Sequence, residues 1–465
     1  MSEGKKEVEV ALATLRRAMT RKQFLALMGA AGLVCAGAGV GLYKYGSFKS
    51  SGKGKVVIIG GGAAGISMAS RLLSYLPNPD ITIIDPSDIH YYQPGFTLIA
   101  SGVYSPDEVS KPQAECMPSG AKWLKDSAVF VDTQKNIVKT AKSGDISYDF
   151  LVVAPGLQIN WNAVEGITYD TIGQGDAYCI YDHAAAVKTW QGIQKFVEKG
   201  GRGIYTDTYT KHKCGGAPKK ICLLSEHLFR KNGNRDKANF EFFTASHELY
   251  DVPFFTPRLL QIYKQRGVGL NLNTRVKGID TAAKKVYFTR SAKNPDTNQV
   301  ESIDFAKDYD FLHFLPPMSA PDFVKESGLS DTEGSHADEG WVATDKETLV
   351  HKKFKNIICL GDVAGIPTSK TSAAIRKQVP IAAKNLCLLM EGKAPEFKYD
   401  GYAACPIITD YGHVLLCEFD YNKDPKITPP LNLFFDMSHE QWVAWLLKVY
   451  MLKPMYFYGM LNGLV

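Results

Sequence analysis

The sequence predicts an α/β fold with two Rossmann-like domains, followed by a C-terminal region of amphipathic helices. Three observations support this prediction. A strand, a glycine-rich loop, a helix and a second strand follow one another between residues 55 and 85. Two further apolar runs, at 148–156 and 356–362, have the composition of strands buried on both faces of a parallel sheet. The C-terminal residues 440–465 are rich in aromatic side chains and contain only three charged groups.

The composition is that of an ordinary globular protein. The chain has 465 residues, of which 45% are hydrophobic and 22% charged. These values exclude long disorder, a collagen-like repeat and a polytopic membrane protein. The net charge of +6 is small for this length, and no nucleic-acid motif is present, so we expect no nucleic-acid partner. Nine cysteines without a CxxC pair argue against a disulfide scaffold and a structural zinc site, and we predict no metal site.

Residues 1–52 are predicted to be an export signal or N-terminal anchor with a linker. Residues 24–43 carry no charge and follow Arg21 and Lys22, and their length just suffices to span a bilayer. Residues 36–38, Ala-Gly-Ala, resemble a signal-peptidase site, and residues 20–25 resemble a twin-arginine export signal with lysine as the second basic residue. A buried Gly/Ala helix of the fold is the alternative.

The first motif predicts a dinucleotide site. The apolar run 55–59 is followed by a GxGxxG loop, a helical pattern, and a second apolar run that ends in Asp85. In such a unit the loop glycines allow a tight turn and close approach of the backbone to a pyrophosphate at the helix N-terminus. The acidic residue suits ribose hydroxyls. The predicted cofactor-binding residues of the loop are Gly60, Gly61, Gly62, Ala63, Ala64 and Gly65.

Two later segments indicate which dinucleotide is bound. Residues 148–156 resemble the segment of flavin-disulfide-reductase-like proteins in which the chain returns to the FAD domain. Residues 356–362 resemble the second return of these proteins, and the resemblance implies that Asp362 binds the ribityl chain of FAD. It therefore implies an FAD-binding domain, 53–159 and 316–400, interrupted by a second Rossmann-like domain, 160–315. Residues 401–465 are predicted to be a C-terminal interface and membrane-attachment region.

The second domain lacks a glycine-spaced phosphate loop. Its candidate strand 202–206 is followed by DTYTKHKCGGAP, which contains no GxGxxG. Flavoenzymes of this plan that use NAD(P)H carry a second such loop here. This argues against a nicotinamide donor and favours a donor that reaches the flavin directly.

Several segments together resemble sulfide:quinone oxidoreductases of the mitochondrial type. The similarity covers about residues 54 to 460 in matching order, and flavocytochrome c sulfide dehydrogenases share the same plan. The segments are HYYQP (90–94), KCGGAP (213–218), SE (225–226), FRK (229–231), LPPM (315–318), GD (361–362), PTSKT (367–371), YDGY (399–402) and CP (405–406).

The resemblance implies a mechanism with two cysteines flanking the flavin. Cys214 matches the one that receives sulfane sulfur, and its basic and glycine-rich neighbours favour a thiolate. The second cysteine is missing, because Val363 stands in its place. Cys359, on the nearby strand, is a weak candidate substitute. Cys405 occupies a position where the family also has cysteine, so it is not an obvious replacement.

The remaining candidates have two interpretations each. Lys370 opens a helix and is predicted to stabilise anionic reduced flavin, with a solvated lysine as the alternative. Gln93 is predicted to contact the flavin or to lie at a loop tip. His212 either supplies a proton near Cys214 or faces solvent. His313 is interpreted as a hydrogen-bonded core residue. The other cysteines are interpreted as packing residues: Cys116, Cys179, Cys222, Cys387 and Cys417.

The C-terminal residues 440–465 favour two short interfacial helices around Pro454. Tryptophan and tyrosine prefer the headgroup region, and lysines can extend outward from it. A buried C-terminal helix or a dimer interface is the alternative.

The sequence thus predicts a membrane-associated FAD enzyme that oxidises sulfide and reduces quinone, with a low-molecular-weight thiol as a candidate sulfur acceptor. The alternatives are a flavocytochrome c type subunit and a redirected flavoprotein without two-cysteine chemistry. The predicted location is the periplasmic face of a bacterial inner membrane, with the mitochondrial inner membrane as the alternative.

Overall fold

A five-stranded parallel sheet forms the first layer of the protein, with strand order β20-β9-β1-β2-β5. The computed structural model describes residues 48–293, 299–428 and 436–465. The strands of this sheet are β1 (Lys55–Ile59), β2 (Asp80–Ile84), β5 (Lys122–Leu124), β9 (Phe150–Val153) and β20 (Ile357–Cys359). The α/β prediction is confirmed, and the four apolar runs read as strands are all in this sheet.

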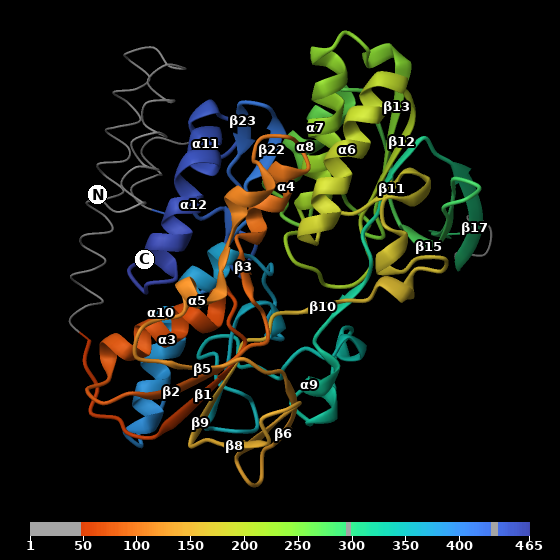
Figure 1. Cartoon of the computed structure of the whole chain (residues 1–465). Helices are drawn as coiled ribbons and strands as arrows, with labels where there is room; N and C mark the ends of the chain where they lie inside the picture. Colours follow the sequence, from red (N-terminus) through yellow and green to blue (C-terminus); the bar gives the residue numbers. More distant parts are fainter. Residues whose placement is uncertain (1–47, 294–298, 429–435) are drawn as a thin grey trace, which may run out of the picture.

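The two faces of this sheet are covered by different elements, because successive side chains of a strand point to opposite faces. Val56 and Ile58 pack in the cluster that contains helix α3 (Ala63–Tyr75), while Val57 and Ile59 pack in a second cluster. Helix α10 (Ser372–Met390) lies against α3 (Figure 1). The opposite face carries α9 (Asp322–Glu326) and the antiparallel strands β6 (Ala128–Asp132), β7 (Ile137–Thr140) and β8 (Asp145–Ser147).

A second parallel sheet has the strand order β11-β18-β12-β13-β14. Its strands are β11 (Ala177–Tyr178), β12 (Gly201–Thr206), β13 (Ala238–Phe243), β14 (Val268–Asn271) and β18 (Phe311–His313). The helices packed around it are α6 (His183–Lys199), α7 (Ala217–Lys231) and α8 (Thr256–Gln265). An antiparallel sheet of β15 (Thr274–Asp280), β16 (Lys285–Lys293) and β17 (Val300–Asp308) extends this half of the molecule.

The chain crosses between the two sheets twice. It leaves the first sheet through β10 (Gln158–Ile159) and returns through β19 (Met318–Ser319), and these strands pair antiparallel (Figure 1). The loops that follow β1, β2 and β20 in the first sheet can therefore approach the loop that follows β12 in the second sheet.

The C-terminal region contains two small antiparallel pairs and a helical segment. The pairs are β21 (Ala403–Ala404) with β24 (Glu418–Phe419) and β22 (Ile407–Asp410) with β23 (His413–Leu415). The helical segment starts with α11 (Trp442–Leu446), continues through α12 (Leu452–Pro454) and ends at Met460. The expectation of two helices separated at Pro454 is wrong, because this proline has helical backbone angles and the segment runs through it.

The inner face of this C-terminal segment packs on the protein core. Tyr456, Phe457 and Met460 are buried there. The Tyr456 hydroxyl lies 2.7 Å from Nε2 of His90, and the Ser70 hydroxyl donates to the Leu461 carbonyl oxygen at 2.6 Å. Part of the aromatic pattern thus serves packing within the protein.

Among the residues that the structure describes, no helix combines the length and apolar character needed to cross a membrane. The apolar segment 24–43 lies outside the described residues. His313 is fully buried, and burial lowers its pKa to about 3, so its imidazole is neutral. The expected hydrogen bond is not formed, because neither ring nitrogen has a partner among the described residues.

Candidate functional site

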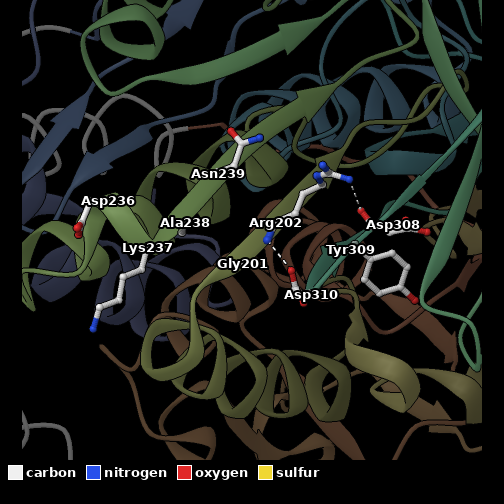
Figure 2. A pocket seen from close by; sticks show the side chains of 9 residues that line it. All are labelled: Gly201, Arg202, Asp236, Lys237, Ala238, Asn239, Asp308, Tyr309 and Asp310. Carbon is white, nitrogen blue, oxygen red and sulfur yellow. Dashed lines mark hydrogen bonds between the residues drawn. The ribbon is translucent and has the colours of Figure 1, made fainter.

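One surface cavity, of about 610 Å³, lies at the amino ends of β12 and β13 (Figure 2). Gly201 and Ala238 are the first residues of these strands. At this cavity the backbone N–H of Arg202 donates to Asp310 Oδ2 at 2.7 Å, and Arg202 Nη1 donates to the Asp308 carbonyl oxygen at 3.3 Å. Ligands of open α/β sheets bind at the carboxyl ends of the strands, so this cavity is not the candidate site.

A larger cavity, of about 730 Å³, lies at the carboxyl ends of strands from both sheets. We call it the central cavity. It is lined by the glycine-rich loop after β1, by Asp85 after β2, by Asp362 after β20 and by Cys214 after β12. Residues from the C-terminal helical segment complete its wall. The fold thus brings most of the predicted site residues to one place.

The glycine-rich loop presents open space to the central cavity. A Cβ atom added at Gly62 would meet no atom within 4 Å, whereas one added at Gly65 would lie 1.8 Å from the Gly60 carbonyl oxygen. Gly65 is therefore required for close packing of α3 on β1, and Gly62 leaves room for a ligand. Ala63 and Ala64 form the first turn of α3, whose N-terminal amides favour an anion.

Asp85 holds the loop as well as lining the cavity. Its Oδ2 accepts a hydrogen bond from the Gly61 N–H at 2.6 Å, and its Oδ1 accepts one from the Ser87 N–H at 2.9 Å. The carboxylate thus fixes the backbone that faces the predicted pyrophosphate position. Binding of ribose hydroxyls by Asp85 stays a prediction.

Asp362 and Lys370 lie on the turn that follows β20. Lys370 Nζ donates to the carbonyl oxygens of Asp362 and Ala364, at 2.5 and 3.1 Å, and stands 3.6 Å from the centre of the Trp341 ring. Burial lowers the pKa of Lys370 to about 7 and raises the pKa of the Asp362 carboxyl. The ammonium is thus held within its own turn, and contact of Lys370 with a flavin stays a prediction.

Cys214 lies on the loop between β12 and α7 and is fixed to the first half of the molecule. Its N–H donates to the Lys370 carbonyl oxygen at 3.0 Å, and its own carbonyl oxygen accepts from the Tyr181 hydroxyl at 3.2 Å. Its φ of +51° is in the left-handed region, which is uncommon for a residue with a side chain. Such strained backbone is concentrated at functional sites.

The thiol of Cys214 is surrounded by groups that stabilise its anion. Cys405 and Lys220 both contact Cys214 Sγ, with the Cys405 Sγ and Lys220 Nζ atoms each 3.3 Å away. The hydrogen bond from Cys405, together with the charge of Lys220, holds the pKa of Cys214 well below its ordinary value. The same contact raises the pKa of Cys405, so the thiolate is favoured on Cys214 rather than on Cys405.

The cation at the sulfur differs from those the sequence suggested. Lys213 Nζ donates to Gln93 Oε1 at 2.7 Å, and His212 Nε2 lies 3.2 Å from Asp207 Oδ1. Lys220, in the first turn of the adjacent helix α7, contacts the thiol instead. Sequence reasoning missed Lys220, which no local pattern marks, and it set Cys405 aside as a replacement for the missing cysteine, although Cys405 is the thiol in contact with Cys214.

The other cysteines do not share this setting. Cys359 is fully buried in β20, in the core cluster on the far face of the sheet, and does not line the central cavity. Burial raises the pKa of Cys116 to about 11. Within the described ranges, no group of three His, Cys, Asp or Glu residues could hold a metal ion.

Comparisons with known proteins show which sequences this chain resembles. The family model described as pyridine nucleotide-disulphide oxidoreductase matches residues 54–191. The chain is similar to mitochondrial sulfide:quinone oxidoreductase of Mus musculus, with 36% identity over 88% of this chain and 86% of that protein. It is similar to the protein of the same name from Dictyostelium discoideum, with 37% identity over 88% and 86% of the two chains.

A solved structure agrees with the fold. The sulfide:quinone oxidoreductase of Aquifex aeolicus superposes with a TM-score of 0.69 and 20% identity, covering 88% of this chain and 92% of that one. At this identity the likeness shows the fold alone.

Proposed function

Because the chain belongs to the mitochondrial-type sulfide:quinone oxidoreductase family, we propose that it oxidises sulfide at Cys214 and reduces a quinone, with FAD as its cofactor. The observation that carries this proposal is the position of Cys214. Its stabilised thiolate lines the same cavity as the glycine-rich loop, Asp85 and Asp362. The sulfur chemistry and the cofactor site are therefore adjacent.

The residues of the central cavity fit FAD. The open space at Gly62 and the N-terminus of α3 suit the pyrophosphate, and the Asp85 and Asp362 carboxylates suit hydroxyl groups of the ribose and the ribityl chain. Bound FAD supplies two-electron exchange between the sulfur substrate and the quinone. Gln93 and Lys370 are proposed as further contacts.

We expect the purified protein to hold about one FAD per chain. Gly62→Leu should lower FAD occupancy at least about tenfold, because its side chain would fill the space at the pyrophosphate. The ratio of flavin to protein absorbance measures this. Gly392→Asn is the matched control, since Gly392 also has an open Cβ position but lies at the far end of α10. Full occupancy in the Gly62 variant would contradict the assignment.

Each residue around Cys214 has a separate task. Lys220 keeps the Cys214 sulfur anionic and hence nucleophilic. Tyr181 and the Lys370 carbonyl fix the backbone on either side of the sulfur. Partial burial of Cys214 limits its contact with bulk water, which strengthens these electrostatic interactions.

We expect sulfide, and neither NADH nor NADPH, to reduce the bound flavin. The turn after β12 has no glycine-spaced loop, and Asp207 at its start is engaged by Lys219, with 2.7 Å between Nζ and Oδ2. Flavin absorbance is followed anaerobically after adding each donor, and a soluble quinone should restore it after sulfide. Rapid loss of absorbance with either nucleotide would count against the proposed donor.

The C-terminal helical segment and the residues that follow it, 461–465, are proposed to face a membrane from which the quinone enters. Tyr458 and Leu464 are 39% and 43% exposed, and Leu464 also lines the central cavity. Further apolar residues of the segment lining the cavity are Leu447, Leu452, Met455 and Met460. An apolar wall that continues to an exposed apolar surface suits a lipophilic substrate.

We expect Tyr458→Ser combined with Leu464→Ser to weaken binding to phospholipid vesicles by about tenfold, because apolar area that enters the interface is lost. Cosedimentation measures binding, and all proteins lack residues 1–47 so that an N-terminal anchor cannot contribute. Val300→Ser with Ile303→Ser is the control, since these side chains are 73% and 50% exposed on β17. Equal binding of the two double variants would argue against the proposed surface.

For the location, the mitochondrial relatives favour the mitochondrial inner membrane. We therefore propose this alternative in place of the periplasmic face, which these relatives do not support.

A further inference from the structure

The chain has a second thiol in contact with Cys214, although valine stands where the family resemblance expects one. Val363 is fully buried in the core cluster on the far face of the first sheet and does not line the central cavity. Cys405 does line it, with its sulfur 3.3 Å from Cys214 Sγ. We propose that Cys405 is the second redox thiol of this protein and forms a reversible disulfide with Cys214 that sulfide opens. This proposal rests on the proposed function.

The backbone around the pair is shaped for this close approach. A disulfide needs the sulfurs at about 2.0 Å, so a small movement of two thiols already in contact suffices. Gly216 makes the approach possible, because a Cβ atom there would lie 2.7 Å from Cys405 Sγ. The Cys214 side is held by its hydrogen bonds to Lys370 and Tyr181.

Two buried lysines provide a positive environment for the pair. Lys220 Nζ contacts Cys214 Sγ at 3.3 Å, and the attraction of Cys214 raises the pKa of Lys220 against the effect of burial. Lys448, on the C-terminal segment, donates to the Pro94 carbonyl oxygen at 3.1 Å and lines the same cavity. Burial lowers the pKa of Lys448 to about 7, with further lowering by Lys220. Both cations favour a thiolate on either sulfur.

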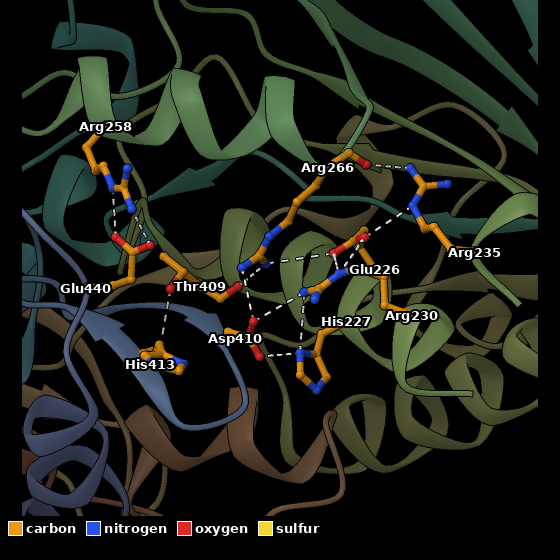
Figure 3. Close-up of polar contacts among 10 residues, drawn as sticks. All are labelled: Glu226, His227, Arg230, Arg235, Arg258, Arg266, Thr409, Asp410, His413 and Glu440. Atoms are coloured by element: carbon orange, nitrogen blue, oxygen red, sulfur yellow. Dashed lines mark hydrogen bonds and ion pairs between the residues drawn. The ribbon is translucent and has the colours of Figure 1, made fainter. Parts of the chain in front are cut away.

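A network of ion pairs fixes the elements that carry the two thiols (Figure 3). Helix α7 begins beside Cys214, and β22 begins two residues after Cys405. Asp410, at the end of β22, accepts from Arg230 and Arg266 at 3.2 Å each and also pairs with His227. Arg230 in turn pairs with the fully buried Glu226 at 3.0 Å. Asp410 thus binds two side chains of α7, His227 and Arg230, and one side chain that follows α8, Arg266. These contacts hold β22 in place.

The proposed reaction is balanced in atoms and electrons. Hydrosulfide attacks Cys214 Sγ, which is the more exposed sulfur, and the Cys214–Cys405 bond breaks. A persulfide forms on Cys214, and Cys405 leaves as a thiolate and takes up a proton. The substrate sulfur is oxidised by two electrons, and the disulfide is reduced by two.

Two further steps complete the turnover. A thiolate acceptor attacks the outer sulfur of the persulfide, takes it as its own persulfide, and leaves Cys214 as a thiolate. The Cys214 thiolate and the Cys405 thiol then lose two electrons and one proton to re-form the disulfide. The final oxidant for this step is the quinone that the proposed activity reduces.

Peptide mass spectrometry tests the pair directly. The FAD-loaded protein is treated with a short-chain quinone, or with diamide in a parallel sample, then alkylated, unfolded and digested without reductant. We expect a peptide pair linked through Cys214 and Cys405. Sulfide should convert it to peptides in which Cys214 carries one extra sulfur and Cys405 is free. Cys405→Ser should abolish the linked peptides and lower sulfide-dependent quinone reduction at least about 100-fold.

Two variants serve as controls. Cys417→Ala removes a buried cysteine from the same region and should leave the linked peptides and the rate unchanged. Gly216→Ala keeps both thiols but displaces Cys405, and it should strongly reduce the linked peptides while FAD stays bound. Cys405→Ser with normal sulfide turnover, or an active wild-type protein that never yields linked peptides, would overturn the proposal. If the wild-type protein reduces no quinone with sulfide, the proposed function fails, whereas linked peptides formed with diamide would still show the thiol pair.

Discussion

Cys214→Ser is expected to lower sulfide-dependent quinone reduction by at least about 1,000-fold, because a serine hydroxyl is far less nucleophilic near neutral pH and cannot hold a persulfide. Steady-state quinone reduction with sulfide measures this loss. The flavin absorbance should be unchanged, since the glycine-rich loop and Asp85 do not contact the cysteine side chain.

Cys359→Ala is the matched control for the Cys214 variant. Cys359 is fully buried outside the central cavity, so its truncation should cost a modest amount of stability, about 1 kcal/mol, and leave the rate near that of the wild type. An active Cys214→Ser protein together with an inactive Cys359→Ala protein would place the reactive sulfur on β20 and refute the assignment.

Lys220→Met is expected to lower the sulfide-dependent rate at neutral pH by about 10- to 100-fold, with recovery at alkaline pH. The pKa of Cys214 is held down by the hydrogen bond from Cys405 and by Lys220, so the thiolate is present above that lowered pKa. Removing the cation raises the pKa, and the thiolate fraction at neutral pH falls. The pH dependence of Cys214 alkylation by iodoacetamide, measured in the reduced protein, should shift in the same direction.

Two variants separate the charge of Lys220 from its packing. Lys220→Arg keeps a cation at the site and should recover part of the rate. Lys231→Met removes an exposed lysine at the end of the same helix and should leave the pH profile unchanged. An alkylation profile identical to the wild type in Lys220→Met would show that this lysine does not control the thiol.

The fold was predictable where short segments carry their own pattern. The run KVVII, the glycine-rich loop and Asp85 lie within about thirty residues, and each has a composition that suits only a few local structures. The structure places them as β1, the turn that leads into α3 and the residue after β2. The helical segment at the C-terminus was less predictable, because Pro454 signals a break in sequence but has helical angles here.

The sequence by itself determined the α/β class and the nucleotide-binding loop, because these depend on neighbouring residues, and the family resemblance of its segments indicated Cys214 as the candidate nucleophile. Only the tertiary structure decided what surrounds that nucleophile. Cys405 is 191 residues from Cys214 along the chain, and the two meet because β22 packs on α7. Lys220 contacts the sulfur because of how helix α7 is oriented, and no recognisable sequence motif marks this lysine. Contacts of this kind follow from how elements pack, and no local periodicity encodes them.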